Sequence, residues 1–422
     1  MPRAILTLNA GSSSIKFALY EMAAAAPARL VSRGQIEGIG SAPHFIARDP
    51  DGTLLTEQRW PASAGLQHEA LLTPLLDWIT SHLGAESLVA VGHRIVHGGD
   101  AYARPVRLSA GVMADLARLT PLAPLHQPHN LAAARAVARL RPDLPQVACF
   151  DTAFHHGMAP TVTRLALPRR YAAEGVRRYG FHGLSYEYIA ARLREQAPAL
   201  AAGRVIAAHL GNGASLCAMR DGRSVDTTMG FTALDGLVMG TRCGNLDPGA
   251  VLYLQQAHKL SAADVERMLY HDSGLLGVSG ISNDMRTLLA SSDVHAHEAI
   301  DLFVFRIVRE IGALTSSLGG LDGLVFSAGI GEHAAPIRAA VCARLAWLGV
   351  ECDAGANAAG TALISTPHSR VQVRVVATDE EAMIAAHTMQ TLYPASPPTH
   401  SPEPQPAHPG HAVRSFAAGD MP

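Results

Sequence analysis

The sequence predicts an α/β fold of two domains built on a duplicated plan. The chain has 422 residues, more than one ordinary hydrophobic core supports, which favours two domains. Short apolar strands alternate with amphipathic helices along it, as is typical of α/β proteins. A strand–turn–strand unit near the N-terminus recurs half a chain later, which indicates an internal repeat.

The repeated unit is a hairpin with a turn of small residues. Residues 3–8 read as a buried strand, followed by Asn9-Ala10-Gly11-Ser12-Ser13-Ser14 and a second strand over 15–20; residues 204–210, 211–215 and 216–220 repeat the pattern. Such turns offer N–H groups and hydroxyls to a phosphate, and Lys16 adds an ammonium. A single turn of this kind is as typical of an ordinary hairpin as of a phosphate site, whereas the presence of two favours a nucleotide-binding protein. The P-loop class is excluded, because G-x-x-x-x-G-K-[ST] is absent from the sequence.

The remaining elements follow from hydrophobic periodicity. Helices are expected over residues 67–82, 110–119, 130–140, 186–195, 261–269 and 295–318. Further strands are expected over 88–91, 146–150, 323–326 and 371–376. From residue 394 the chain is rich in Pro, His and Ser without an apolar period, which predicts a disordered tail over 394–422.

Composition narrows the class of partner and the compartment. The formal net charge is −2, so no long-range field favours nucleic acid or an anionic membrane. No apolar run reaches transmembrane length, and the N-terminal apolar run is too short for a signal sequence. The five cysteines form no CxxC pair, which is typical of reduced thiols in a cytoplasmic protein.

A dinucleotide-binding fold is the first alternative. The segment VFSAGIGEHA, residues 325–334, places Gly329-x-Gly331-x-x-Ala334 between a strand and a helix, and Glu351 or Asp353 lies about 20 residues on. The motif comes late in the chain, however, and nothing nearby supplies hydride chemistry. The same glycines equally let a backbone pass close to an adenosine.

Glycine-flanked basic residues indicate an anion site. They occur in GHRIVHGG (92–99), RRYGFHGLS (177–185) and MGTRCGNLDPG (239–249). A single arginine would be interpreted as a surface ion pair, but three such turns favour a polyanion. The histidine pairs at 93 and 97, 126 and 129, and 155 and 156 could suggest zinc. Without a cysteine partner or HExxH, a structural or anion-binding role is favoured.

Acidic residues follow the predicted strands. Asp151 ends the strand over 146–150, at the edge where α/β sheets bind ligands, although it could instead cap a helix. Glu380 lies similarly after the strand over 371–376. Asp284 and Arg286, in GISNDMR, could form a capped turn or contact a nucleotide.

Together these segments resemble the acetate kinase family. Nine of them match in order and spacing: LNAGSSSIKF (8–17), GHRIVHGG, PLAPLHQPHN (121–130), CFDTAFHHGM (149–158), RRYGFHG, AHLGNGAS (208–215), MGFTALDGLVMGTR (229–242), SGLLGVSGISNDMR (273–286) and SAGIGEH (327–333). The resemblance extends over residues 3–392. It implies the duplicated fold shared by acetate and sugar kinases, actin and the heat-shock ATPases, with a catalytic cleft between domains. It places residues 1–151 with 382–393 in the first domain and 152–381 in the second, and it implies a homodimer.

The resemblance also implies a site that uses ATP and Mg²⁺, with Mn²⁺ as a possible substitute. Asn9 and Glu380 would hold the metal, and Arg94 the substrate carboxylate. Asp151 would be the catalytic acid group, with His182 and Arg242 stabilising the transition state. The substrate methyl would lie among Val96, Leu125, Phe181 and Ala233. The ATP contacts would be Ser12, Ser14, Lys16, His209, Leu210, Gly211, Asn212, Gly213, Asp284, Met285, Arg286, Gly329, Ile330, Gly331, Glu332 and His333.

A few positions depart from the family pattern. Tyr186 stands where histidine is common, and Ala233 where proline is usual. Because proline is the larger residue, the resemblance leaves a propionate kinase with a wider pocket as the alternative. A carboxylate nucleophile is ionised at neutral pH and needs no base. Asp151 is therefore expected to orient an arginine or a metal-bound water rather than to abstract a proton.

Overall fold

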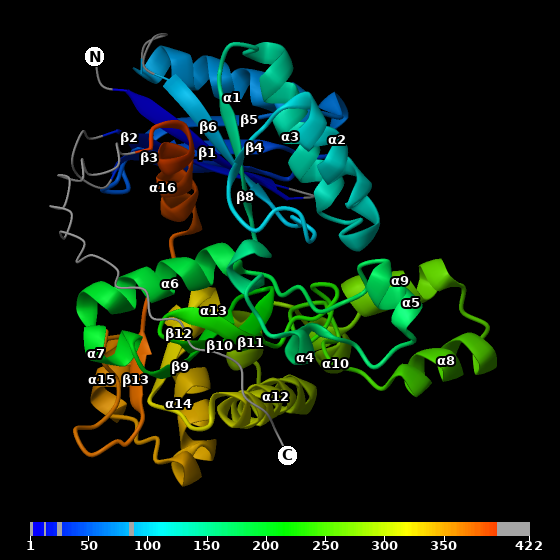
Figure 1. Cartoon of the computed structure of the whole chain (residues 1–422), viewed down its shortest axis with the longest axis vertical. Helices are drawn as coiled ribbons and strands as arrows, with labels where there is room; N and C mark the ends of the chain where they lie inside the picture. The colour runs from blue at the N-terminus through cyan, green and yellow to red at the C-terminus, as the bar shows by residue number, and fades with distance from the viewer. Residues whose placement is uncertain (1–2, 12–13, 23–27, 84–87, 395–422) are drawn as a thin grey trace, which may run out of the picture.

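The computed structural model describes residues 3–11, 14–22, 28–83 and 88–394. It confirms the α/β class: two mixed sheets, each covered by helices, lie one above the other in Figure 1. The predicted tail over 394–422 falls outside the described residues except for Pro394, and so does Ser12.

The first sheet contains eight strands in the order β5-β4-β3-β2-β1-β6-β8-β7. Its central strand β1 pairs antiparallel with β2 and parallel with β6, which is in turn parallel to β8. The strands are β1 (Ala4–Ala10), β2 (Ser14–Glu21), β3 (Arg29–Glu37), β4 (His44–Arg48), β5 (Leu54–Arg59), β6 (Leu88–Ile95), β7 (Val106–Arg107) and β8 (Gln146–Phe150).

The second sheet repeats the plan of the first. Its order is β11-β10-β9-β12-β13, with β9 antiparallel to β10 and parallel to β12. The strand order β3-β2-β1-β6-β8 in the first sheet therefore corresponds strand for strand to β11-β10-β9-β12-β13 in the second, and the predicted duplication is confirmed. The strands are β9 (Arg204–Leu210), β10 (Ala214–Arg220), β11 (Arg223–Thr227), β12 (Gly323–Ser327) and β13 (Gln372–Val375).

Helices cover both faces of each sheet. On the first sheet α1 (His68–Leu83) and α3 (Gln127–Leu140) cover one face, while α16 (Glu380–Leu392) covers the other. On the second, α12 (Val294–Leu318) and α14 (Ala335–Arg344) lie opposite α6 (Gly183–Gln196) and α7 (Pro198–Ala201). The other helices are α2 (Ala110–Arg118), α4 (Pro160–Thr163), α5 (Arg169–Ala173), α8 (Pro248–Ala257), α9 (Ala262–His271), α10 (Gly274–Ser279), α11 (Met285–Leu289), α13 (Ala328–His333) and α15 (Ala354–Ala359).

The C-terminal helix α16 returns to the first sheet. It packs directly on β6, because Gly92 has no side chain there: a Cβ at that position would lie 2.2 Å from Thr388 Oγ1 and 2.5 Å from Ile384 Cγ2. This contact brings the N-terminal end of α16, which carries Glu380, to the carboxyl ends of β1, β6 and β8.

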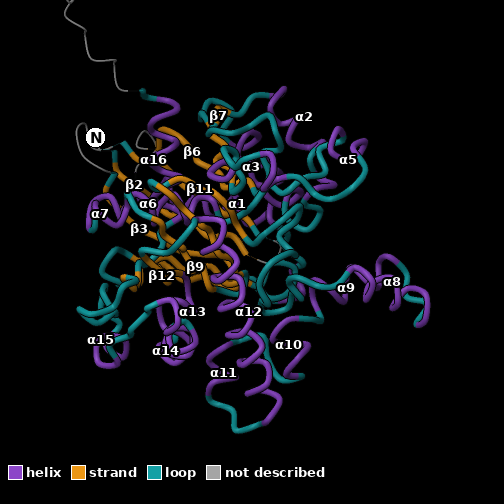
Figure 2. Tube along the Cα trace, turned by 60° about the horizontal axis from the view of Figure 1, so that its bottom comes forward, coloured by secondary structure: helices purple, strands orange, loops and turns teal. Residues whose placement is uncertain are grey.

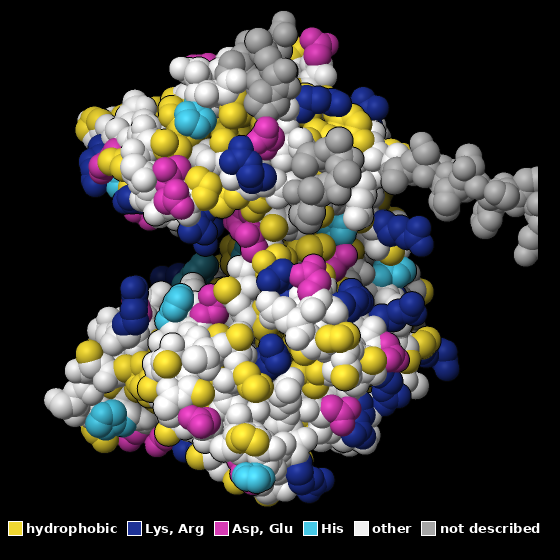
Figure 3. All heavy atoms as spheres, turned by 90° about the vertical axis from the view of Figure 1, so that its left-hand side faces the viewer, with side chains coloured by type: hydrophobic (Ala, Val, Ile, Leu, Met, Phe, Trp, Pro, Cys, Tyr) yellow, Lys and Arg dark blue, Asp and Glu magenta, His cyan; other side chains and the backbone are white. Residues whose placement is uncertain are grey.

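Two features of the outer shape bear on function. Figure 3 shows a hollow between the two halves, in which Lys, Arg and His side chains lie. Figure 2 shows α8 and α9 projecting from the body, and on α8 Leu252 and Tyr253 are exposed. Among the described residues no helix is both long and apolar enough to cross a membrane.

Candidate active site

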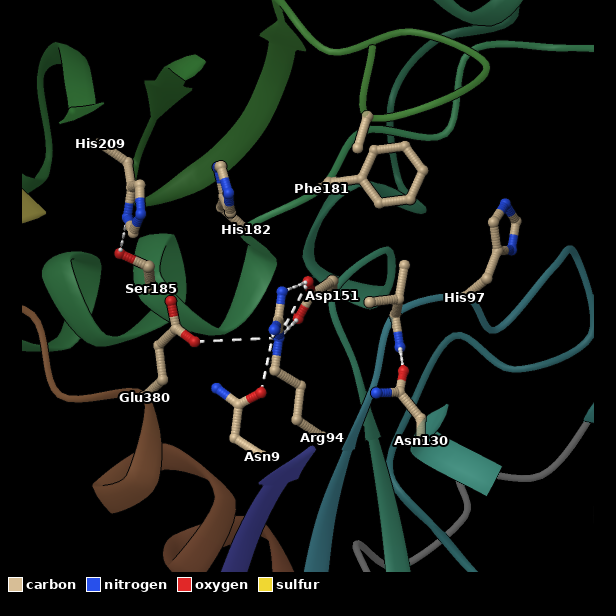
Figure 4. Close-up of polar contacts among 12 residues, drawn as sticks. Asn9, Arg94, His97, Asn130, Asp151, Phe181, His182, Ser185, His209 and Glu380 are labelled. Carbon is tan, nitrogen blue, oxygen red and sulfur yellow. Dashed lines mark hydrogen bonds and ion pairs between the residues drawn. The ribbon is translucent and has the colours of Figure 1, made fainter. Parts of the chain in front are cut away.

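Polar side chains from three central strands and α16 converge on Arg94 (Figure 4). The Arg94 guanidinium donates through Nε and Nη2 to the Asp151 carboxylate, at 2.9 and 2.5 Å. Its Nη1 donates to Asn9 Oδ1 at 3.0 Å, and Glu380 Oε2 lies 3.9 Å from Nε. The parallel strands β1, β6 and β8 end at one edge, so they bring residues 9, 94 and 151 together.

Asp151 orients Arg94 and does not cap a helix. Its carboxylate is buried, and among the described residues the side-chain donor to it is Arg94. The 3-10 helix that follows, Ala153–His155, has no side-chain cap. Burial raises the pKa of the Asp151 carboxyl, and the charge of Arg94 opposes that rise. The capping alternative is therefore wrong, while the expected orientation of an arginine fits this geometry.

Two histidine rings stack near Arg94, on the side away from Asn9 in Figure 4. The rings of His182 and His209 lie 4.2 Å apart and 20° from parallel. His182 occupies a left-handed backbone conformation, with φ of 58°, directly before α6. Burial lowers the pKa of His182 well below 6.5, and the charges of His209, Arg94 and Arg242 lower it further. Both rings are therefore neutral at pH 7, since the pKa of His209 falls to about 4 for the same main reason.

Arg242 lies against the glycine turn between β9 and β10. A Cβ at Gly213 would lie 2.8 Å from Arg242 Nη2 and 3.3 Å from His182 Nε2, so a larger residue there would displace the Arg242 guanidinium. Arg242 Nη1 donates to the Ala233 carbonyl at 2.6 Å. Burial lowers the pKa of Arg242, and nearby Arg94 lowers it further. The site thus holds two arginines close together, which favours an anion between them.

A small apolar cavity lies next to these arginines. Its volume is about 10 Å³, which is room for roughly one water-sized group. The sequence predictions placed Val96, Leu125, Phe181 and Ala233 around one substrate methyl, and all four line this cavity. Its other lining residues are Leu122, Ala123, Pro124, His126, Thr232 and Tyr270.

A much larger pocket is lined in part by Gly211 and Asn212 of the same glycine turn. Its volume is about 570 Å³, the size of a small-molecule or nucleotide site. Eight predicted ATP contacts line it, namely Gly211, Asn212, Asp284, Met285, Arg286, Gly329, Ile330 and His333. Asp284 also caps α11 and pairs with Arg286, which confirms the capped turn, while its contact with a nucleotide stays a prediction.

Other predicted ATP contacts lie elsewhere. Lys16 pairs with Asn9 across β1 and β2, so both side chains lie on one face of the sheet. The Ser14 carbonyl accepts from the Gly11 N–H and closes the first turn. Leu210 and Gly331 are buried, and the Glu332 carboxylate accepts the N–H groups of Ala328 and Thr378. Leu210, Gly331 and Glu332 are therefore outside the lining of the large pocket.

The dinucleotide-binding alternative is wrong. Half of the second sheet is antiparallel, unlike the parallel sheet of that fold. Asp353 caps α15 and Glu351 accepts from Thr366, so both carboxylates have local structural partners. Within the described ranges, no group of three or more His, Cys, Asp or Glu side chains could hold a metal, so the zinc alternative has no support.

Comparison with known proteins decides the family. A model of the acetokinase family matches residues 4–386. The chain belongs to the acetokinase family. The chain is 55% identical over 391 residues to an acetate kinase of Rhodopseudomonas palustris (strain ATCC BAA-98 / CGA009), with 92% of this chain and 98% of the relative covered. The predicted kinase class is confirmed.

Solved acetokinase structures share the fold. An acetate kinase of Porphyromonas gingivalis superposes with a TM-score of 0.83 at 37% identity, covering 92% of this chain and all of that chain. A propionate kinase from Francisella tularensis subsp. tularensis SCHU S4 gives 0.86 at 35% identity, with the same coverage.

Several residues of this acetokinase site were not predicted from the sequence. Asn130 accepts from the Val96 N–H at 2.9 Å and donates to the Ala10 carbonyl at 2.6 Å, joining the ends of β6 and β1. His126 lines the small cavity; burial, then the charges of Arg242 and Arg94, lower its pKa to about 4. In the sequence, the only indication that Asn130 and His126 belong to the site was their place in the segment 121–130. Asn283, Leu289, Ala334 and Pro336 complete the large pocket.

Proposed function

We propose that this acetokinase is an acetate kinase, which transfers the γ-phosphoryl group of ATP reversibly to acetate and forms acetyl phosphate and ADP. The relatives that support acetate are the acetate kinases of Rhodopseudomonas palustris and of Rhizobium meliloti, the latter 53% identical over 389 residues. Both alignments extend over 92% of this chain and 98% of the relative.

One observation carries the proposal: cationic and N–H donor groups adjoin the walls of a methyl-sized cavity and the glycine turn at a nucleotide-sized pocket. Arg94 precedes the cavity wall Val96 by two residues, and His182 follows the wall residue Phe181. Arg242 is fixed to the carbonyl of the third wall residue, Ala233. An acetate with its methyl in the cavity would therefore direct its carboxylate toward the large pocket.

This arrangement suits direct transfer. The acetate carboxylate is ionised, so the main obstacle is bringing one anion to another. Arg94 and Arg242 offset that repulsion, and His182 adds an N–H donor to the phosphoryl oxygens. Asp151 holds Arg94 in place. Because these residues include no activated nucleophile, transfer is expected to be in line, without a phosphoenzyme.

The residues present fit a magnesium ion. Asn9 offers an amide oxygen and Glu380 a carboxylate, and Mg²⁺ prefers oxygen ligands while retaining waters and substrate phosphates. We propose that these two residues hold Mg²⁺, or Mn²⁺ in its place. The bound ion would neutralise charge on the phosphate oxygens.

The wider assembly is part of the same proposal. Residues 1–151 with 382–393, and residues 152–381, are proposed as two domains that close on the cleft. The exposed apolar side chains of α8, Leu252 and Tyr253, support a homodimer. The enzyme is proposed to act in the cytoplasm.

An acyl hydroxamate assay tests the function. The protein is incubated with ATP, Mg²⁺ and acetate, propionate or butyrate, and acyl phosphate is trapped with hydroxylamine. Acetate is expected to give the highest kcat/KM and butyrate the lowest. The matched control omits ATP. Absence of acetyl hydroxamate in the complete mixture would refute the proposal, and a higher kcat/KM for propionate would favour the propionate kinase alternative.

A further inference from the structure

The two stacked histidines are each held by a chain of two hydroxyl groups. His182 Nδ1 lies 2.8 Å from Ser215 Oγ, which lies 2.5 Å from the Tyr186 hydroxyl. His209 Nδ1 lies 2.8 Å from Ser185 Oγ, which accepts from the Thr378 hydroxyl at 2.8 Å. Each chain includes one hydroxyl from α6, Tyr186 in the first and Ser185 in the second, and each ends on the Nδ1 atom of one ring.

The direction of the first chain follows from proton counting. A serine hydroxyl has one proton to donate, and Ser215 and Tyr186 are both fully buried. If His182 Nδ1–H donated to Ser215, then Ser215 would donate to the Tyr186 oxygen, and the phenol proton would need another acceptor. Among the described residues the side-chain partner of the phenol is Ser215, and its backbone hydrogen bond with His209 lowers the phenol pKa, as an N–H that donates to the phenol oxygen does. Tyr186 therefore donates to Ser215, and Ser215 donates to His182 Nδ1.

The second chain has the same direction. The Thr378 hydroxyl donates to Ser185, whose own proton is then available for His209 Nδ1. A neutral imidazole that accepts at Nδ1 carries its proton at Nε2. Both rings are neutral, because burial among Arg94, Arg242 and Lys16 disfavours the imidazolium and only Asp151 favours it at His209.

The Nε2 atoms of both rings face the glycine turn of the large pocket. A Cβ at Gly213 would lie 3.3 Å from His182 Nε2, and one at Gly211 would lie 3.9 Å from His209 Nε2. This is the side from which a phosphoryl group would approach acetate in the proposed reaction.

We propose that the two hydroxyl chains lock His182 and His209 as a stacked pair of neutral Nε2–H donors aimed at the transferring phosphoryl group. Tyr186 and Ser215 are positioning residues for His182, and Thr378 and Ser185 are positioning residues for His209. The claim that these donors face a phosphoryl group rests on the proposed function, whereas the assignment of the Nε2–H tautomers does not. A donor whose proton is already in place needs no reorganisation as charge develops on the phosphoryl oxygens.

Imidazole ¹⁵N NMR measures the tautomers directly. The full-length protein is labelled with ¹⁵N-histidine, and the two rings are assigned with His182→Gln and His209→Gln. Both rings are expected as neutral Nε2–H tautomers from pH 6 to 8. In Tyr186→Phe, His182 is expected to gain Nδ1–H tautomer while His209 is unchanged. In Thr378→Val the response is expected at His209 instead.

Activity provides the second readout. Tyr186→Phe is expected to lower kcat by about three- to tenfold, with little change in either KM, because one oriented donor is partly lost. Tyr179→Phe is the matched control: its hydroxyl donates to the Gly175 carbonyl at 2.7 Å, and no recorded hydrogen bond links it to His182. The control removes a comparable phenol hydrogen bond and is expected to leave the His182 tautomer and kcat unchanged.

The outcomes separate this inference from the proposed function. An Nδ1–H tautomer or an imidazolium at His182 in the wild type at pH 7 would overturn the inference, even if Tyr186→Phe does not fold. An unchanged His182 spectrum in a folded Tyr186→Phe would also overturn it. Nε2–H tautomers in a protein that forms no acetyl phosphate would instead refute the proposed function and leave the hydroxyl chains standing.

Discussion

Ala233→Pro tests how tightly the small cavity selects its acid. Ala233 forms one wall, opposite the buried side chains of Val96 and Phe181. Proline at this position retains the carbonyl that accepts from Arg242 Nη1, and within the described part of the chain the Ala233 N–H donates no hydrogen bond that proline would remove. The substitution therefore adds ring carbons to the wall and keeps the contact that fixes Arg242.

The cavity sets the expected magnitude. Its volume of about 10 Å³ holds one water-sized group, so acetate fills it and the extra carbon of propionate needs space at the half-buried Ala233 wall. An apolar pocket discriminates one methylene by roughly 1–3 kcal/mol. With the small alanine wall we expect the low end, so that propionate is within about tenfold of acetate in kcat/KM. With proline we expect roughly a hundredfold preference for acetate.

The assay measures kcat/KM for acetate and propionate in both proteins by hydroxamate formation. Val96→Ala is the opposite control, because it enlarges the cavity from another wall and leaves the Ala233 carbonyl in place; it is expected to favour propionate. A wild-type preference for acetate of about a hundredfold, unchanged by Ala233→Pro, would refute the wider-pocket reasoning.

Four further outcomes are expected. Arg242→Ala should lower kcat by about 10²–10³ with a modest change in the KM for ATP, and a near-normal kcat in steady-state assays would contradict its role. Arg94→Ala should raise the KM for acetate. It should also lower the free energy of unfolding by about 3–5 kcal/mol in urea denaturation, because it leaves Asp151 buried without its partner. An unchanged unfolding midpoint would count against that pairing. Deleting residues from Pro394 onward should leave rate and melting temperature nearly unchanged, and a clear loss of either would show that the tail packs on the body. Burial lowers the pKa of four buried histidines (93, 97, 155 and 209) and of the half-buried His126 to about 4. The unfolded chain therefore binds more protons than the folded chain below pH 6.5, and stability should fall between pH 6.5 and 4, by at most about 1.4 kcal/mol per pH unit for each histidine. Urea midpoints that do not change from pH 7.5 to 5 would contradict this.

Local sequence was enough to predict the parts of the fold that carry strong patterns. The two hairpins with small-residue turns, and their duplication, follow from apolar runs interrupted by Gly, Asn and Ser, and β1–β2 and β9–β10 confirm them. The strands β3 to β5 were missed, because they lie toward the outer edge of the first sheet and β5 is mostly exposed, so it has little apolar alternation. Predicted helix 130–140 begins earlier, at Gln127, with a proline in its first turn.

The sequence by itself determined which residue types the site has, because each stands in a distinctive local motif and the motifs match one family. It could not assign their pairings, which depend on chain crossings. Arg94 and Asp151 are 57 residues apart, and they meet because β6 and β8 are parallel neighbours that end at one edge. Thr378 and Ser185 are 193 residues apart. Asn130 had no signal beyond its place in the segment 121–130, and the hydroxyl chains had none, because a buried hydrogen bond is a property of two positions in space. Only the tertiary structure decided which atom of each histidine is free to face the cleft.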